Sequence, residues 1–401
     1  MTKQNTKLNI ALCVNRFYPE IGGAETNLYL QAKYLAKNHA VTVYTPKRSD
    51  AKSSENLEKF KVKRLFDLFN LKRRFPNLKA NTFCPSLFFH ILFARNLDVI
   101  LTFPSVNFNA MLALLAAKIK RVPIIMCSFD AFDYSEIIKS GHQEKIKSLS
   151  SQDLPRRERF AAKYFSKILV ISERERRLFS KIHHDVEYVP VPFNEEEFLP
   201  LAQKGSKDSE QPSGDSDIFT FLCLGRISEI KGQDLALEAF IEAEKKMPNA
   251  RLVFVGRSDY ASDYYGRLQT RIRDLGLEEK VSFTGAVPRD EVINWLARSD
   301  ISVFPVRFMN SGAVITESWA ANIGVIQSDA VDPNLVEPEH NGLLFESENI
   351  AQLSEAMICT YNNPEMTKNM GINGNKLAYE GYTYEKLIAQ YERIIGKIRS
   401  T

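Results

Sequence analysis

The chain has 401 residues, of which 44% are hydrophobic and 25% charged. This composition is typical of a globular protein and excludes a disordered or fibrous one, and the length is sufficient for two domains. No apolar run approaches the eighteen or so residues of a transmembrane helix, and the five cysteines lie far apart, without a C-x-x-C pair. We therefore expect a cytoplasmic protein that has no secretory leader, disulfide framework or zinc cluster.

The net charge of +4 conceals a difference between the two halves. Residues 1–200 carry 32 Lys and Arg against 20 Asp and Glu, whereas residues 201–401 carry 21 against 29. The basic excess is concentrated in residues 47–79, which hold eleven basic and four acidic side chains. Such an excess indicates an anionic partner of the N-terminal half: a membrane surface, a phosphorylated acceptor or nucleic acid. Residues 59–74 read as a basic helix that packs one face on the core or contacts a membrane.

In chain order, short apolar runs alternate with helical patterns. The first half predicts strands at residues 9–14, 41–45, 98–103, 123–127, 168–171 and 187–191, with helices at 26–37, 109–120 and 173–181. Several strands are continuous apolar runs, as in a parallel sheet that is covered on both faces. This alternation indicates a doubly wound α/β domain.

Residues 202–217 read AQKGSKDSEQPSGDSD, a linker or flexible loop with almost nothing to bury. The alternation then restarts, with strands predicted at residues 219–224, 251–255, 281–284, 301–304, 325–327 and 342–345. Helices fit residues 234–246, 263–275, 289–298, 313–321 and 350–361, and a last helix at 384–398 can cross back over the first domain. Both halves thus share one α/β architecture, and such domains bind ligands at the carboxyl ends of their strands.

The first loop of interest reads FYPEIGGAE and joins the first strand to the first helix. Gly22 and Gly23 have no Cβ, so backbone N–H groups there can approach a phosphate closely. An ordinary tight turn before a helix explains the same two glycines. The dinucleotide fingerprint G-x-G-x-x-G is not present at this position.

Two further loops lie in the second half. The segment LGRISEIKG places Arg226 and Lys231 on one strand-to-helix connection, where they suit a diphosphate or are simply solvated surface cations. The segment FPVRFMNSGAVITESWAA places Gly312 before a helix that carries Glu317. Its N-terminal N–H groups can bind an anion, and Glu317 can bind ribose hydroxyls or stabilise the helix N-terminus.

Taken in order with the segments VPVPFNEEEFLP, VFVG, VSFTGAVP and NGLLF, these loops resemble glycosyltransferase family 4 over residues 9–391. The resemblance implies a retaining, nucleotide-sugar-dependent enzyme of GT-B architecture, with two Rossmann-like doubly wound domains facing across a cleft. The first domain, residues 1–200, would bind the acceptor, and the helix at 384–401 can pack back on it. Residues 201–217 would be the linker or loop, and residues 218–383 the donor domain.

The resemblance also implies residue roles. Arg226 and Lys231 would neutralise the leaving diphosphate in place of a metal ion, and Glu317 would hold the ribose. The remaining donor-side residues are Gly22, Gly23, Arg257, Val287, Met309, Asn310, Ser311, Gly312, Ala313 and Val314, and the acceptor-side residues are Glu25 and Asp130. No cofactor or metal is expected, and the partners would be a nucleotide diphosphate sugar, a saccharide or lipid-linked acceptor and an anionic membrane surface, with no nucleic acid.

The sequence departs from the family pattern at three places. Met309 stands where members carry a Glu, residues 127–130 lack a usual His, and the segments around Asn322 and Asn334 differ from the usual motifs. The leading hypothesis is a retaining hexosyltransferase that builds a surface glycan or a lipid-linked saccharide. The alternative is a catalytically silent subunit that stabilises an active partner. A sugar-nucleotide epimerase on the same fold lacks a supporting acid/base pair.

Overall fold

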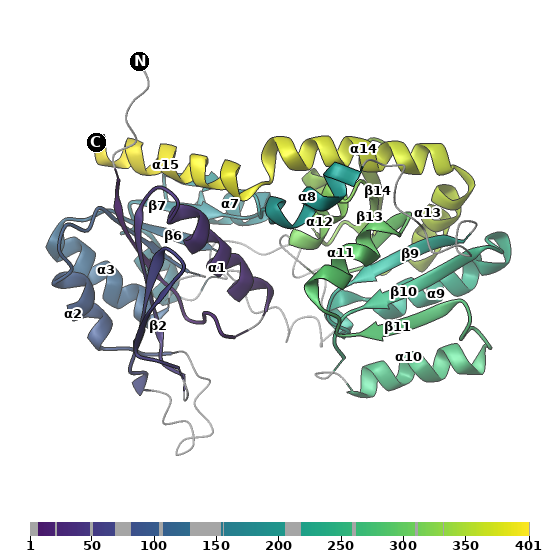
Figure 1. Ribbon diagram of the computed structural model, residues 1–401, viewed down its shortest axis with the longest axis horizontal. Coiled ribbons are helices and arrows are strands. Elements are labelled where there is room, and N and C mark those ends of the chain that lie inside the picture. Colours follow the sequence, from purple (N-terminus) through teal and green to yellow (C-terminus); the bar gives the residue numbers. More distant parts are fainter. Residues whose placement is uncertain are drawn as a thin grey trace. The chain divides into compact units, whose positions relative to one another are not determined.

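The computed structural model describes residues 7–20, 22–48, 51–68, 82–103, 107–128, 154, 156–204, 218–258, 262–308, 312–331 and 333–400. Among these, residues 7–190 and 384–400 form a first compact unit and residues 191–383 a second (Figure 1). None of the helices in the described ranges is both long enough and apolar enough to cross a bilayer. The expected α/β class, with two doubly wound sheets, is confirmed.

The first unit is built on an eight-stranded sheet in the order β3-β4-β2-β1-β5-β6-β7-β8. All neighbouring strands are parallel except β3 and β4, which are antiparallel. The central strands β5, β6 and β7 are buried along their whole length, which is why they read as continuous apolar runs. The strands are β1 (Asn9–Cys13), β2 (Ala40–Pro46), β3 (Ser54–Leu57), β4 (Phe60–Leu65), β5 (Val99–Thr102), β6 (Ile124–Ser128), β7 (Lys167–Val170) and β8 (Val186–Tyr188).

Helices cover both faces of this sheet. Side chains of α2 (Ser86–Leu92), α3 (Phe108–Lys120), α6 (Arg156–Ala162) and α7 (Glu173–Phe179) share one core with Met126 of β6. The neighbouring Cys127 points to the other face, where it contacts Tyr391 of α15 (Tyr384–Ser400). That helix packs on α1 (Gly23–Leu35), where the Tyr391 hydroxyl donates a hydrogen bond to Gln31 at 3.1 Å. The C-terminal helix is therefore part of the first unit.

The second unit is built on a six-stranded, all-parallel sheet in the order β11-β10-β9-β12-β13-β14. Phe221 and Cys223 of β9 point into a core shared with α9, α10 and α13, whereas Leu222 points into a core shared with α8, α11, α12 and α14. The strands are β9 (Phe219–Leu224), β10 (Ala250–Val255), β11 (Val281–Gly285), β12 (Ile301–Phe304), β13 (Gly324–Ser328) and β14 (Gly342–Phe345). The helices are α8 (Glu195–Lys204), α9 (Gln233–Ala243), α10 (Ser262–Asp274), α11 (Arg289–Ala297), α12 (Ala313–Ala320), α13 (Ile350–Asn362) and α14 (Pro364–Gly381).

The structure corrects the helix expected over residues 59–74. Residues Phe60–Leu65 form strand β4, which pairs with β2 on one side and β3 on the other. Its side chains alternate between an exposed Lys61 and a buried Val62, the period of a strand. Arg64, part of the basic stretch, is buried and forms an ion pair with Glu55, so it is not an exposed cation. Residues 69–81 lie outside the described ranges.

The unit boundary falls ten residues earlier than the predicted domain boundary. Residues 191–200 belong to the second unit, where the Phe193 N–H donates a hydrogen bond to the Tyr382 carbonyl at 2.9 Å. Helix α8 then extends into residues 202–204 of the predicted linker, and residues 205–217 lie outside the described ranges.

Candidate functional site

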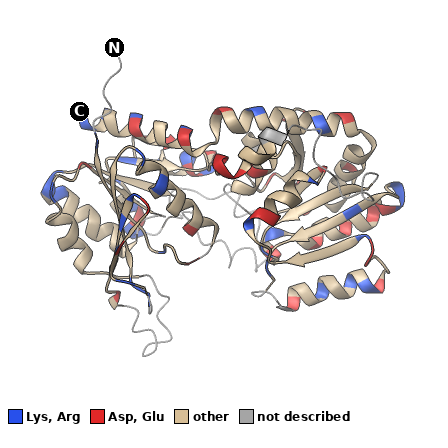
Figure 2. Ribbon diagram, viewed as in Figure 1, with Lys and Arg blue, Asp and Glu red and all other residues tan. Residues whose placement is uncertain are grey.

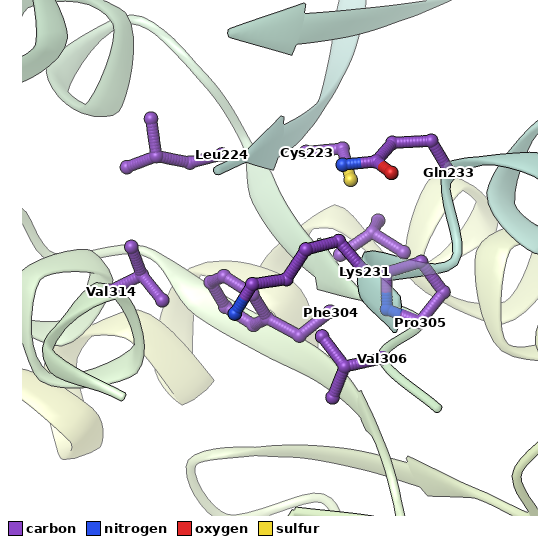
Figure 3. Close-up of a pocket in the computed structure, with 9 residues that line it drawn as sticks. Cys223, Leu224, Lys231, Gln233, Phe304, Pro305, Val306 and Val314 are labelled. Carbon is purple, nitrogen blue, oxygen red and sulfur yellow. The ribbon is translucent and has the colours of Figure 1, made fainter. Parts of the chain in front are cut away.

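A pocket opens at the carboxyl edge of the second sheet, between β9 and β12 (Figure 3). From β9 the chain winds outward to β10 and β11, and it then returns to add β12 on the other side of β9. The pocket therefore lies at the topological switch point, where open α/β sheets bind their ligands. Its lining consists of Cys223, Leu224, Lys231, Gln233, Val303, Phe304, Pro305, Val306 and Val314.

Lys231 is the one charged residue among those nine. It ends the 3-10 turn η2 (Glu229–Lys231) between β9 and α9. Figure 3 shows its side chain running past the ring of Phe304, with the amine nitrogen on the side of Val314. Burial raises the pKa of the Cys223 thiol to about 12, and the Lys231 charge opposes that rise. The ammonium charge thus acts on the inside of the pocket.

The connection that carries Lys231 packs directly on the loop after β12. Gly232 has φ +68°, and a Cβ at this position would fall far inside van der Waals contact with the Pro305 carbonyl. The Arg307 N–H also donates a hydrogen bond to the Ile230 carbonyl at 2.9 Å. Only glycine fits both the left-handed backbone and the close approach. This close packing holds Lys231 over the pocket.

Gln233, at the start of α9, holds the backbone of the segment that carries Arg226, the other predicted cation. Its side chain is buried, its Nε2 donates to the Arg226 carbonyl at 2.9 Å, and its Oε1 accepts from the Ser228 N–H at 3.2 Å. Arg226 itself is exposed. The sequence reasoning missed Gln233. The available signal was a polar residue on the buried stripe of a helix directly after the loop.

Arg307, in the loop after β12, also bonds to the connection between β9 and α9. Its guanidinium donates to the Glu229 carbonyl at 2.6 Å and forms an ion pair with Asp234 at 2.8 Å. Burial alone would raise the pKa of Asp234, but Arg307 and the Tyr264 hydroxyl hold it below its usual value. Tyr264 donates to Asp234 at 2.7 Å. This network was also missed, because it joins residues 30 and 73 positions apart.

The loops after β10 and β11 are joined to the loop after β9 by their backbones. The Gly225 N–H donates to the Val255 carbonyl at 2.9 Å, and the Gly256 N–H donates to the Gly285 carbonyl at 3.1 Å. Gly256 has φ +150°, and a Cβ there would collide with the Gly225 carbonyl. The three loops thus form one hydrogen-bonded edge.

The predicted donor-side residues Arg257 and Val287 lie on these loops. The Arg257 carbonyl accepts a hydrogen bond from the Ile227 N–H at 2.9 Å, which brings Arg257 beside the segment that carries Arg226. Val287 packs partly buried against the apolar core on the α12 side of the sheet. Neither residue lines the pocket of Figure 3.

Glu317 lies in the second turn of α12 and is 9% exposed. Its Oε1 accepts from Arg289 at 2.6 Å, and the same guanidinium donates to Glu197 of α8 at 2.7 Å. Burial opposes the charge of Arg289, yet these two carboxylates raise its pKa above the ordinary value. The observed partner of Glu317 is therefore Arg289 rather than the N-terminus of its own helix.

At the start of α12, the N-cap Gly312 is extended and provides no side-chain acceptor for the first-turn N–H groups. Those groups include Ala313 and Val314, and Val314 also lines the pocket. The predicted donor residues Met309, Asn310 and Ser311 lie outside the described ranges, as does Asp130.

The remaining predicted residues lie in the first unit. Gly22 is the N-cap of α1 and likewise offers no side-chain acceptor, and Glu25 follows in the first turn. A Cβ at Gly22 would meet the Glu25 carboxylate, which therefore lies at the helix N-terminus, where a negative charge is favourable. A Cβ at Gly23 would meet no described heavy atom within 4 Å.

Comparison with known proteins places the chain in a family. The family model described as Glycosyltransferase Family 4 matches residues 21–197, and the model described as Glycosyl transferases group 1 matches residues 206–377. The chain belongs to glycosyltransferase family 4. The predicted family is thereby confirmed.

Curated relatives of this family-4 chain are distant. A GDP-mannose-dependent alpha-(1-6)-phosphatidylinositol monomannoside mannosyltransferase of Mycolicibacterium smegmatis is 24% identical, over 53% of this chain and 56% of the relative. The chain spans about half the length of the first such relatives that it matches. Alpha-monoglucosyldiacylglycerol synthase of Streptococcus pneumoniae is 23% identical over 90% of this chain and 80% of its own length.

Solved structures share the fold across the whole family-4 chain. HepE of Anabaena, in complex with UDP, matches with a TM-score of 0.76 and 18% identity, covering 97% of this chain and 100% of that one. Sucrose-phosphate synthase of Thermosynechococcus elongatus matches with a TM-score of 0.71 and 16% identity, covering 98% and 100%. At these identities the likeness shows the fold alone, and this is the expected GT-B fold.

Proposed function

We propose that this protein transfers a hexose from a nucleotide diphosphate sugar to an acceptor hydroxyl, with retention of the anomeric configuration and without a metal ion. The single observation that carries the proposal is the pocket at the switch point of the second sheet. Lys231 lines it, and Arg226 lies on the same rigidly held connection. Family membership gives independent support for a glycosyltransferase.

Arg226 and Lys231 bind the donor diphosphate in this proposal. A guanidinium can fork two phosphate oxygens, while an ammonium adds a compact charge. Because Gln233 and Gly232 fix the connection before any ligand binds, the cations need little reorganisation as charge develops on the leaving diphosphate. They thereby supply the charge neutralisation that a metal ion would otherwise give.

In the bond-making step, the bond between the sugar C1 and the phosphate oxygen breaks, and its electron pair stays on the diphosphate. The acceptor hydroxyl oxygen bonds to C1 on the same face, and its proton passes to a leaving phosphate oxygen. This route needs no protein base, so the missing His in residues 127–130 does not prevent it. The N–H groups of Gly312, Ala313 and Val314 would add donors to the phosphates.

Glu317 is proposed to bind the ribose hydroxyls. A carboxylate has two oxygens with about four acceptor positions, so pairing with Arg289 through Oε1 leaves capacity for a hydroxyl. Arg289 acts as a positioning residue, since it orients that carboxylate and is itself held by Glu197. Gly22, Gly23, Arg257, Val287, Met309, Asn310 and Ser311 remain predicted donor residues, and Glu25 and Asp130 remain predicted acceptor residues.

For the substrates, we propose a GDP- or UDP-hexose donor and an acceptor that is part of a lipid-linked saccharide or surface glycan. The names of the two curated relatives above support this class, since one is GDP-mannose-dependent and acts on a phosphatidylinositol mannoside and the other makes a glucosyldiacylglycerol. HepE was solved with UDP-glucose, which supports a UDP-sugar equally. We also propose that the protein is cytoplasmic and meets such acceptors at a membrane surface.

The test is nucleotide release from a panel of GDP- and UDP-hexoses, measured with the full chain, with and without a chelator. We expect slow hydrolysis of one donor, unaffected by EDTA, that falls at least tenfold in Lys231→Ala. The anomeric configuration of the released sugar, read by NMR, tests retention. Absence of turnover with every donor, together with intact folding, would instead support the silent subunit that Met309 suggests.

A further inference from the structure

A surface of the first unit carries large apolar side chains that the fold leaves exposed. On α3, Met111, Leu115 and Ile119 recur every four residues and therefore form one stripe, with 37%, 55% and 57% of each residue exposed. On α2 and directly after it, Phe89 and Phe93 are 56% and 74% exposed, with ring centroids 6.4 Å apart. We call these five residues the α2–α3 face.

The five residues belong to two helices that are packed together. The Lys120 ammonium, at the end of α3, donates to the Leu92 carbonyl at the end of α2 at 3.2 Å. Behind the exposed stripe, Ala113 and Ala117 of α3 and Leu87 of α2 share the core of the sheet. The helices thus need only their inner stripes for folding. Large apolar side chains that the fold leaves exposed as a group are typical of an interaction site.

The two helices of this face carry charges of one sign. Residues 82–97 and 107–123, which contain both helices, include no Asp or Glu. Their basic residues gather where the two helices end: Arg95 follows α2, and Lys118, Lys120 and Arg121 end α3. Figure 2 shows the ribbons of α2 and α3 mostly in tan, with the blue of basic residues at the end of α3.

We propose that the α2–α3 face docks on an anionic lipid bilayer. Exposed Phe, Leu, Ile and Met side chains enter the headgroup boundary, and Lys and Arg beside them bind anionic headgroups. A second copy of the chain fits less well, because a two-fold interface would bring together two copies of helices that carry cations and no Asp or Glu. This location also replaces the basic helix expected in residues 59–74.

Co-sedimentation with vesicles tests the docking directly. We expect the full chain to bind vesicles of phosphatidylcholine with 30% phosphatidylglycerol at low salt, to bind at least tenfold less at 0.5 M salt, and to bind pure phosphatidylcholine weakly. Lys118→Gln combined with Arg121→Gln removes two cations, which lowers partitioning about tenfold or more.

A second variant separates lipid insertion from simple charge attraction. Leu115→Gln combined with Ile119→Gln should also lower partitioning at least tenfold, because the apolar stripe no longer enters the bilayer. The matched control is Ile372→Gln on α14, which is 49% exposed and should bind as the wild type does. Thermal unfolding of each variant checks that its fold is intact.

Two results would overturn the docking proposal. One is no vesicle binding by the wild type at low salt. The other is a dimer in sedimentation velocity that the Leu115→Gln and Ile119→Gln pair abolishes, which would assign the face to a second copy. Nucleotide binding by the same preparations is measured in parallel, so that failure of docking is distinguished from failure of the proposed transferase activity.

Discussion

Both units have glycines at the turns where a strand leads into a helix, but the reasons differ. In the second unit, Gly232 and Gly256 have positive φ and pack so closely on neighbouring carbonyls that no other residue fits. In the first unit, Gly23 begins α1 with an ordinary backbone, and a Cβ there would meet open space among the described residues. Folding explains the first two glycines and does not explain the third.

The comparison distinguishes glycines that allow a site to form from a glycine that leaves room for a ligand. In the second unit, glycine lets three loops approach one another, and the resulting edge holds Lys231 and Arg226. In the first unit, a glycine that the fold does not need leaves room at a helix N-terminus, where our proposal brings the donor close. Substitution of each glycine by alanine should therefore give opposite results in stability and in activity.

The largest expected effect is that of Gly232→Ala. The added Cβ collides with the Pro305 carbonyl and occupies a left-handed backbone, so we expect a loss of about 2–3 kcal/mol in the free energy of unfolding. The measurement is urea unfolding of the full chain. The control Gly266→Ala lies inside α10 with no described atom near its Cβ, and it should stabilise the protein slightly. Equal stability of the two variants would contradict the claim that close packing requires glycine at position 232.

Gly23→Ala should have the opposite effects, with stability retained and activity lowered. Because its backbone is helical and its surroundings are open, unfolding should be unchanged or slightly more difficult. Donor turnover should nevertheless fall about tenfold, since the methyl group occupies space reserved for the ligand; this corresponds to about 1.4 kcal/mol of transition-state stabilisation. The assay is nucleotide release at saturating donor. Wild-type turnover in this variant would mean that Gly23 is only part of a turn.

Arg289→Gln should give a smaller effect, confined to the donor. The variant leaves Glu317 without its guanidinium partner, so we expect the donor KM to rise about threefold to tenfold with little change in kcat, as for loss of uniform binding. Arg289→Lys should recover part of the loss. The control Arg271→Gln on α10 removes an exposed pair with Glu238 of α9 and should leave KM unchanged. A fall in stability without a change in KM would contradict the positioning role.

The sequence was most informative where burial determines the pattern of apolar residues. Strands β9, β12 and β14 were predicted with their observed bounds, and the first two lie in the centre of the sheet, where buried parallel strands read as largely apolar runs. Helix α14 was missed because it contains three glycines. Two of them pack against other elements: a Cβ at Gly374 would meet the Trp319 ring, and one at Gly371 would meet the Asn322 carbonyl. Tertiary packing there overrides helix propensity.

The residues of the candidate site likewise differ in whether the sequence could predict them. Lys231 was predictable, since its position between a strand and a helix places it at the carboxyl edge of a parallel sheet. Arg289 and Arg307 were not, because each acts through a partner that only the folded chain brings near. Met309 was a visible departure from the family pattern, and its consequence remains a prediction.

The central claim is that a nucleotide diphosphate binds where Lys231 and Arg226 lie, and titration calorimetry with UDP and GDP tests it most directly. We expect one of the two to bind wild type, and Lys231→Ala or Arg226→Ala to weaken that binding about 10–100-fold, because each charged hydrogen bond contributes roughly 1.5–3 kcal/mol. The control Lys245→Ala, an exposed lysine after α9, should bind normally, and the uncharged nucleoside should bind poorly to every variant. Undiminished diphosphate binding by Lys231→Ala would contradict the account.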